Sequence, residues 1–180
     1  MFKFNKNNVI YWAQKYEDCY SPEDKRNEER LKNTLKRQRY LTQNNLYDVL
    51  NWKSPRTRRY AKENAPPIIA KITRNSFGTG DEKSRIESLL GQKGGLRGVG
   101  YPVASTILHF AFPDKYPIMD FRVIRSLRMK QPSSYKFYFW ENYCKRIRSL
   151  SKKYGLSIRV VEKALWKFDK EQNSRIDKCE

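Results

Sequence analysis

The chain has 180 residues, of which 38 are Lys or Arg and 19 are Asp or Glu, so its net charge at neutral pH is +19. Its length is sufficient for one sizeable hydrophobic core, and an aromatic content of 14% excludes a disordered chain. Folding does not require this charge imbalance, whereas a polyanion attracts it, so nucleic acid is the leading partner.

The three cysteines, Cys19, Cys144 and Cys179, are far apart in sequence, so they suggest neither a disulfide framework nor a zinc pair and suit a reducing compartment. No apolar run approaches the length of a membrane span, and the N-terminus lacks the apolar core of a signal peptide. We therefore expect a monomer without membrane contact, metal or cofactor. The expected location is the cytoplasm, on the nucleoid if the source is a prokaryote.

In the first third of the chain, apolar residues recur at helical spacing between helix caps. The stripe Val9, Ile10, Trp12, Ala13 and Tyr16 predicts a helix that ends near Ser21-Pro22. Ser21 is then the expected cap of a charged helix that extends to about Arg39 and buries Leu31 and Leu35. Thr42 is expected to cap a third helix, which carries Leu46, Val49 and Leu50 and ends within Asn51–Pro55; another helix is expected from Pro55.

Trp52 and Lys53 lie in this expected turn, and Arg56, Arg58 and Arg59 follow closely. An aromatic side chain among cations can stack on a base while the cations hold the phosphate backbone. Alternatively, Trp52 packs under the helix turn while the arginines face water. Both interpretations remain open from the residues alone.

The middle of the chain is expected to form two helices, followed by a glycine-rich connection to a third. A helix is expected from Pro66, with Ile68, Ile69 and Ile72, to about Phe77, and a shorter one over Asp81–Leu90. A glycine-rich stretch, Gly91–Gly95, precedes the motif Gly98-Val99-Gly100, after which a buried helix is expected over Tyr101–Ala111. Such a motif can expose backbone N–H groups at the start of a helix, where a phosphate oxygen binds. The neighbouring Lys93, Arg97 and Tyr101 are expected to contribute to the same anion site.

The last third of the chain also has the helical period. A helix is expected from Asp120 to Leu127, and others over Tyr135–Tyr154, which Gly155 ends, and from Ser157 to about Glu171. Trp140 and Trp166 are expected in the core, and residues 172–180 are expected to fray. His109, the only histidine, is expected as a satisfied core residue rather than a base. With no alternating strand pattern, the whole chain is predicted to be all-α.

Leu96–Arg125 resembles the helix-hairpin-helix DNA glycosylases, the endonuclease III superfamily. That family has a Leu-x-Gly-Val-Gly hairpin, a helix with small residues and a catalytic aspartate in this order. Asp120 follows Gly100 by 20 positions, as in the family pattern, and Arg125 matches as well. Pro102 stands where members that also cleave the backbone carry a Schiff-base lysine, so the resemblance implies a glycosylase without lyase activity.

The resemblance implies an all-α, bilobal DNA glycosylase-like fold formed by residues 1–180 as one domain, with the helix-hairpin-helix at about 81–112. It implies that Asp120 is catalytic, that Arg125 contacts DNA, and that the inter-helix turn, with Trp52, Lys53 and Arg56, faces double-stranded DNA. From its position alone, Asp120 could instead cap a helix or pair with Arg122 or Arg125. A non-catalytic helix-hairpin-helix protein that only binds nucleic acid is therefore the alternative, and an RNA-binding helical protein is a second one.

Overall fold

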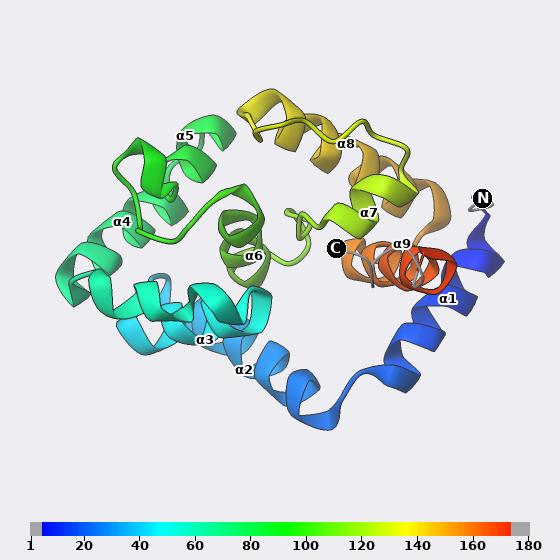
Figure 1. Ribbon diagram of the computed structural model, residues 1–180, viewed down its shortest axis with the longest axis horizontal. Coiled ribbons are helices and arrows are strands. Elements are labelled where there is room, and N and C mark those ends of the chain that lie inside the picture. The colour runs from blue at the N-terminus through cyan, green and yellow to red at the C-terminus, as the bar shows by residue number, and fades with distance from the viewer. Residues whose placement is uncertain (1–4, 174–180) are drawn as a thin grey trace. The chain divides into compact units, whose positions relative to one another are not determined.

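The protein is described by a computed structural model over residues 5–173. Within this range every regular element is a helix, and the one strand-like pairing is an isolated bridge between Leu90 and Leu96, so the all-α prediction is confirmed (Figure 1). The elements are α1 (Lys6–Cys19), α2 (Pro22–Gln38), α3 (Gln43–Lys53), the 3₁₀ helix η1 (Pro55–Glu63), α4 (Pro66–Gly78), α5 (Glu82–Glu87), the 3₁₀ turn η2 (Gly91–Lys93), α6 (Tyr101–Ala111), α7 (Phe121–Ser126), α8 (Phe137–Tyr154) and α9 (Ile158–Asn173).

The chain divides into two compact units. One consists of Ser21–Tyr116, which we call the hairpin unit because it contains Gly98-Val99-Gly100. The other consists of the described residues of Met1–Tyr20 and Pro117–Glu180, which we call the aspartate unit because it contains Asp120. Each unit is described by itself.

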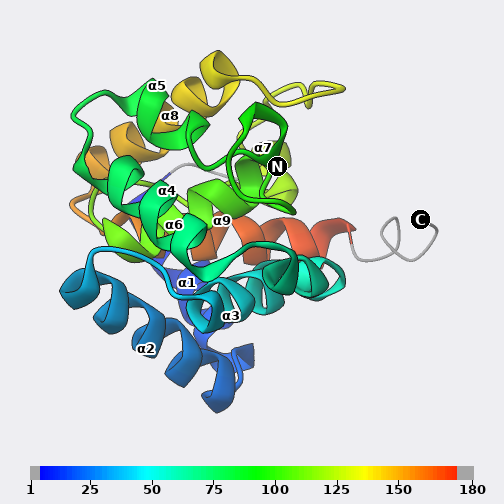
Figure 2. The ribbon, with the colours of Figure 1, turned by 90° about the vertical axis from the view of Figure 1, so that its left-hand side faces the viewer.

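The hairpin unit is built around α6. This helix is buried along nearly its whole length, including Val103, Ala104, Ile107 and Leu108, and α2, α3 and α5 pack against it (Figure 2). An apolar helix of this kind has no face for water, so it requires neighbours on several sides. The first residues of α6, which follow the glycine motif, are therefore held on a rigid core element.

Side chains cap three helices of the hairpin unit, and two of these caps, Ser21 and Thr42, are the ones that the sequence predicts. The side-chain oxygens of Ser21, Thr42 and Asp81 accept hydrogen bonds from the backbone N–H groups of Asp24, Asn45 and Ser84, respectively. Such bonds satisfy backbone donors that have no partner inside the helix. The predicted beginnings of α2, α3 and α5 are confirmed, but α5 ends at Glu87 rather than at the predicted Leu90.

A helix begins at Pro55 as expected, but it is a 3₁₀ helix in which Ala61 alone is buried. Another expectation for the hairpin unit needs correction. In α4, Ile69 is buried, but Ile68 is 48% exposed. The buried face of α4 instead contains Thr73 and Ser76, because their hydroxyls bond the backbone of Leu41 and Arg85 at 2.9 and 2.7 Å.

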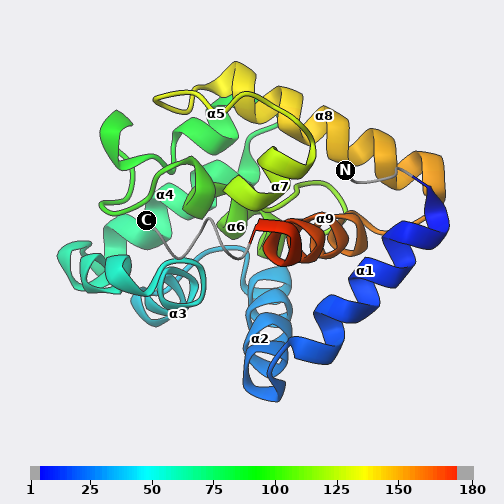
Figure 3. The same cartoon turned by 45° about the vertical axis from the view of Figure 1, so that its right-hand side comes forward.

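In the aspartate unit, α9 contacts α1, α7 and α8 (Figure 3). Trp140 is fully buried and Gly155 ends α8 with φ 62°, both as predicted. Three expectations differ: Ile10 is 46% exposed, because α1 buries Val9 and Ala13 instead, α8 begins at Phe137 rather than at Tyr135, and Trp166 is only half-buried.

The C-terminal expectations are tested only in part. The structure extends α9 to Asn173, so Gln172 and Asn173 are helical rather than frayed. Residues 174–180, and with them Cys179, lie outside the described residues. Cys19 and Cys144 are free thiols. His109 is fully buried, as expected of a core histidine, and its Nδ1 lies 2.8 Å from the Tyr116 carbonyl oxygen.

Candidate functional site

The glycine motif forms a tight backbone turn immediately before α6. Gly98 has φ +82°, a conformation that glycine adopts readily and other residues rarely do. A Cβ at this position would also lie 2.6 Å from the Cβ of Tyr60, so the ring of Tyr60 lies directly against the hairpin backbone. Gly98 is therefore required both by its conformation and by the space around it.

The turn presents a group of backbone N–H donors at the start of α6. No side chain in the described part of the chain caps this helix. The N–H groups of Gly98, Gly100, Tyr101 and Val103 have no acceptor among residues 5–173. First-turn amides carry the positive end of the helix dipole, so they attract an anion. Val99 differs from the expectation, since its N–H donates to the Leu96 carbonyl at 3.0 Å within the hairpin.

A shallow, open depression of about 510 Å³ lies at the hairpin. It is lined by Gly91, Gln92, Gly95 and Arg97–Gly100. Most of this lining is glycine, so a ligand there meets backbone rather than side chains. The glycine-rich stretch before Leu96 thus contributes to the same surface as the motif that follows it.

The two cations beside the hairpin are both paired with glutamates. Lys93 Nζ lies 2.8 Å from Glu87 Oε2, and Arg97 Nε lies 2.8 Å from Glu63 Oε2. Exposed pairs of this kind contribute little to stability, so a phosphate can displace the carboxylate. Tyr101 is 3% exposed and its hydroxyl donates to Glu87, so its side chain is not available to a ligand. Burial, followed by the charge of Glu87, raises the pKa of Tyr101 above its ordinary value.

The turn after α3 combines packing with exposed charge. The Trp52 ring is half-buried and meets the Phe110 ring edge-on, with 5.3 Å between the ring centroids. This contact agrees with the packing interpretation of Trp52. Lys53 is half-buried, whereas Arg56 is exposed in the first turn of η1. The hairpin unit therefore contains Trp52, Lys53, Arg56, Lys93 and Arg97–Tyr101, which are nine of the eleven predicted site residues.

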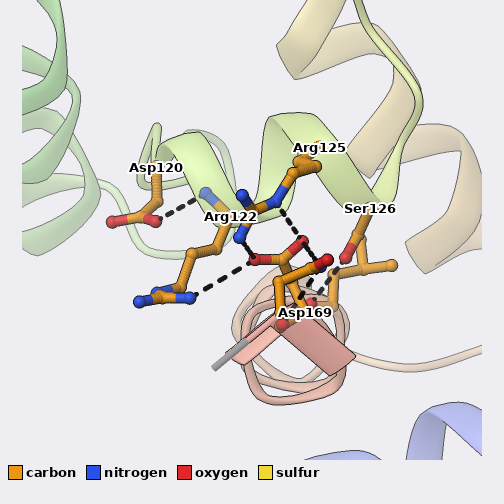
Figure 4. Close-up of polar contacts among 7 residues, drawn as sticks. Asp120, Arg122, Arg125, Ser126 and Asp169 are labelled. Carbon is orange, nitrogen blue, oxygen red and sulfur yellow. Dashed lines mark hydrogen bonds and ion pairs between the residues drawn. The ribbon is translucent and has the colours of Figure 1, made fainter. Parts of the chain in front are cut away.

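Asp120 lies in the aspartate unit as the N-cap of α7. Its Oδ1 accepts a hydrogen bond from the Arg122 N–H at 3.0 Å, which is the capping geometry that the sequence allows (Figure 4). The residue is half-buried. Burial, followed by the charge of the Asp120 carboxylate, raises the pKa of the Tyr135 phenol above its ordinary value. A carboxylate held in this way has a fixed orientation.

Arg125, the other predicted residue of this unit, binds a carboxylate that the sequence did not single out. Its Nε and Nη2 donate to the two oxygens of Asp169 at 2.7 and 2.6 Å, and Arg122 Nη1 lies 3.5 Å from the same group. Asp169 is 2% exposed, and Ser126 adds a hydrogen bond from α7 to the Leu165 carbonyl at 2.8 Å. These contacts fix the six-residue α7 to α9, with Asp120 at its far end (Figure 4).

Two further properties of the described residues bear on the site. Residues 5–173 contain no group of three or more His, Cys, Asp or Glu side chains that could hold a metal ion. None of the helices in the same range has the length and apolar character needed to cross a membrane.

No family model, no curated protein and no solved structure matches this chain.

Proposed function

We propose that this protein is a helix-hairpin-helix protein that binds the phosphate backbone of double-stranded DNA. The observation that carries the proposal is the group of backbone N–H donors at Gly98, Gly100, Tyr101 and Val103, beside an uncapped helix start. Such donors bind a phosphate oxygen without regard to base sequence. The net charge of +19 supports the same partner, because binding to DNA releases condensed counterions.

Within this class, the particular activity that we propose is a DNA glycosylase of base-excision repair, with the bilobal fold of that superfamily. The enzyme hydrolyses the N-glycosidic bond of a damaged or modified base after the nucleotide is flipped out of the duplex. As the base leaves, positive charge develops on the sugar, and the Asp120 carboxylate stabilises it and orients the attacking water. Its capping bond to the Arg122 N–H engages Oδ1 and holds the group in one orientation.

The strand itself stays intact in the proposed reaction. A Schiff base requires an amine, and Pro102 supplies none at the position where lyase members carry lysine. The product is therefore an abasic site that alkali cleaves.

One observation favours a second candidate, a binding protein without catalysis. The hydrogen bond from the Arg122 N–H to Asp120 means that capping of α7 is by itself a sufficient reason for an aspartate at this position. Asp81 caps α5 in the same way, accepting from the Ser84 N–H, and no chemistry is invoked for it. The two candidates share the hairpin and differ only in what Asp120 does.

Substitution at Asp120 separates them. Asn caps a helix as well as Asp does, so Asp120→Asn keeps the cap and removes the charge, whereas Asp120→Ala removes both. The assay incubates each protein with duplexes that carry single lesions, adds alkali to reveal abasic sites, and records the melting temperature (Tm) in parallel. If the protein is a glycosylase, both variants are expected to lose base release, while Asp120→Asn keeps the Tm of the parent.

The matched control is Asp81→Asn, which changes an equivalent cap and leaves base release at the parent rate. Excision at the parent rate by Asp120→Asn refutes the catalytic role of Asp120. If the parent releases no base from any duplex but still binds DNA, the non-catalytic candidate is the correct one. A covalent adduct trapped by borohydride contradicts the assignment of Pro102.

A further inference from the structure

The C-terminal end of η1 is attached to the hairpin by the side chain of Asn64, which is 6% exposed. Its Oδ1 accepts a hydrogen bond from the Arg97 N–H at 2.8 Å, and its Nδ2 donates to the Arg97 carbonyl at 3.1 Å. Nδ2 also donates to the Tyr60 carbonyl at 2.7 Å. One buried amide thus pairs with both backbone groups of Arg97 and connects them to η1, 33 residues away in sequence.

Two other contacts restrain the same end of η1. The ring of Tyr60 fills the space beside Gly98, where a Cβ would be 2.7 Å from its Cδ2. On its other side, η1 is held to α3, because Gln43 Nε2 donates to the carbonyls of Ala61 and Asn64 at 3.4 and 3.0 Å. Buried, hydrogen-bonded contacts of this kind leave little freedom, so they restrain η1 against the hairpin.

The 3₁₀ helix η1 carries the least compensated positive charge near the hairpin. Its four cations, Arg56, Arg58, Arg59 and Lys62, are exposed, and none of them forms an ion pair with a carboxylate of the described chain. By contrast, Lys93 and Arg97 each have a glutamate partner at 2.8 Å. The side chains that can bind phosphate without first losing a carboxylate partner are therefore on η1, where Arg58 and Arg59 donate to neutral oxygens.

We propose that η1 and the hairpin form a single phosphate-binding surface for duplex DNA, and that Asn64 is the residue that positions the two parts. The proposal rests on the proposed DNA binding and is independent of base excision. Phosphates recur regularly along a duplex, so one can bind the hairpin amides while its neighbours bind the cations of η1. A fixed spacing between the two parts lets both contacts form without a further loss of conformational freedom.

The test measures DNA binding by Asn64→Ala. The probe is a fluorescein-labelled duplex of about 20 base pairs without a lesion, titrated by anisotropy between about 50 and about 200 mM NaCl. We expect the dissociation constant to rise about tenfold. The salt slope should fall by about one or two, since every phosphate that the variant no longer neutralises lowers the slope by about 0.9.

Thr73→Val is the matched control. The Thr73 hydroxyl is also a buried side-chain connection between distant segments of the hairpin unit, because it accepts from the Leu41 N–H 32 residues away. This variant is expected to lose a similar amount of melting temperature and to bind DNA like the parent. If Asn64→Ala does not fold, Asn64→Ser replaces it, because its hydroxyl retains part of the hydrogen bonding.

A double-mutant cycle shows positioning rather than mere stability. Gly100→Ala and Arg58→Gln, introduced singly and together, are expected to be coupled in the parent and additive in the Asn64→Ala background. Parent-like affinity and salt slope in Asn64→Ala, or a coupling that survives in it, overturns the inference while leaving DNA binding intact. A parent protein that fails to bind the duplex overturns both this inference and the proposed function.

Discussion

Alanine at Gly98 is predicted to lower stability and alanine at Gly100 to lower DNA affinity, although the two glycines are separated by one residue. At Gly98, the left-handed conformation costs a non-glycine residue about 1–2 kcal/mol. Forcing a methyl group to within 2.6 Å of Tyr60 Cβ adds about 1–3 kcal/mol. A total of about 3 kcal/mol lowers the Tm of a chain of this length by about 6–12 °C.

Gly100 has no such restriction. Its φ of −103° and ψ of −177° suit any residue, and the nearest atom to a Cβ would be Pro102 Cδ at 3.9 Å. Stability should therefore change by less than about 0.5 kcal/mol. The new methyl group lies at the start of α6, where it hinders a phosphate. Loss of one hydrogen bond to a charged group, about 1.5 kcal/mol, weakens DNA binding about tenfold for all sequences alike.

The assay compares thermal unfolding with duplex affinity for the parent and both variants. Gly98→Ala is expected to melt early, and Gly100→Ala to melt with the parent and bind weakly. If Gly98→Ala melts at the parent temperature, the described packing of Tyr60 on the hairpin is wrong. If Gly100→Ala binds duplex as tightly as the parent, the N–H group at the start of α6 is not the phosphate site.

Three other predictions follow from contacts in the two units. Glu63→Gln releases Arg97 and removes a carboxylate from the proposed DNA-binding surface, so we expect the affinity for duplex DNA to rise roughly 2- to 5-fold. Anisotropy titration should show a larger rise than in Asp48→Asn, the control for net charge. Asp169→Ala leaves two arginines of α7 without their buried carboxylate, so we expect the free energy of unfolding, measured by urea titration, to fall by about 2 kcal/mol. The loss is no larger because the arginines are partly exposed. An unchanged urea midpoint would contradict the buried ion pair. Burial raises the pKa of Tyr101 in the folded protein above the unfolded value of about 10, so the stability that this neutral phenol contributes is fully present below about pH 10 and is lost as the pH rises further. The urea midpoint is therefore expected to fall in alkali. If phenolate absorbance shows that all 12 tyrosines of the folded protein titrate at the ordinary pKa, this prediction is wrong.

Local sequence determined most of the helical structure and the shape of the hairpin. Caps such as Ser21 and Thr42 act on N–H groups within three residues, and the positive φ of Gly98 reflects the freedom of a residue without a side chain. Asp120 also follows this rule, because its capping bond reaches only to Arg122. Interactions over such short distances along the chain can be predicted from the order of residues alone.

Tertiary structure decided which of these residues have partners. Asn64 lies in a charged segment without any pattern that marks it, and its role appears only when the chain brings Arg97 beside it. Arg125 was expected to contact DNA, yet a carboxylate 44 residues away binds it in the fold. Ile68 is exposed while Thr73 is buried, because the hydroxyl finds an acceptor and a donor inside. Burial and ion pairing depend on distances between segments remote in sequence, and packing of the whole unit sets those distances.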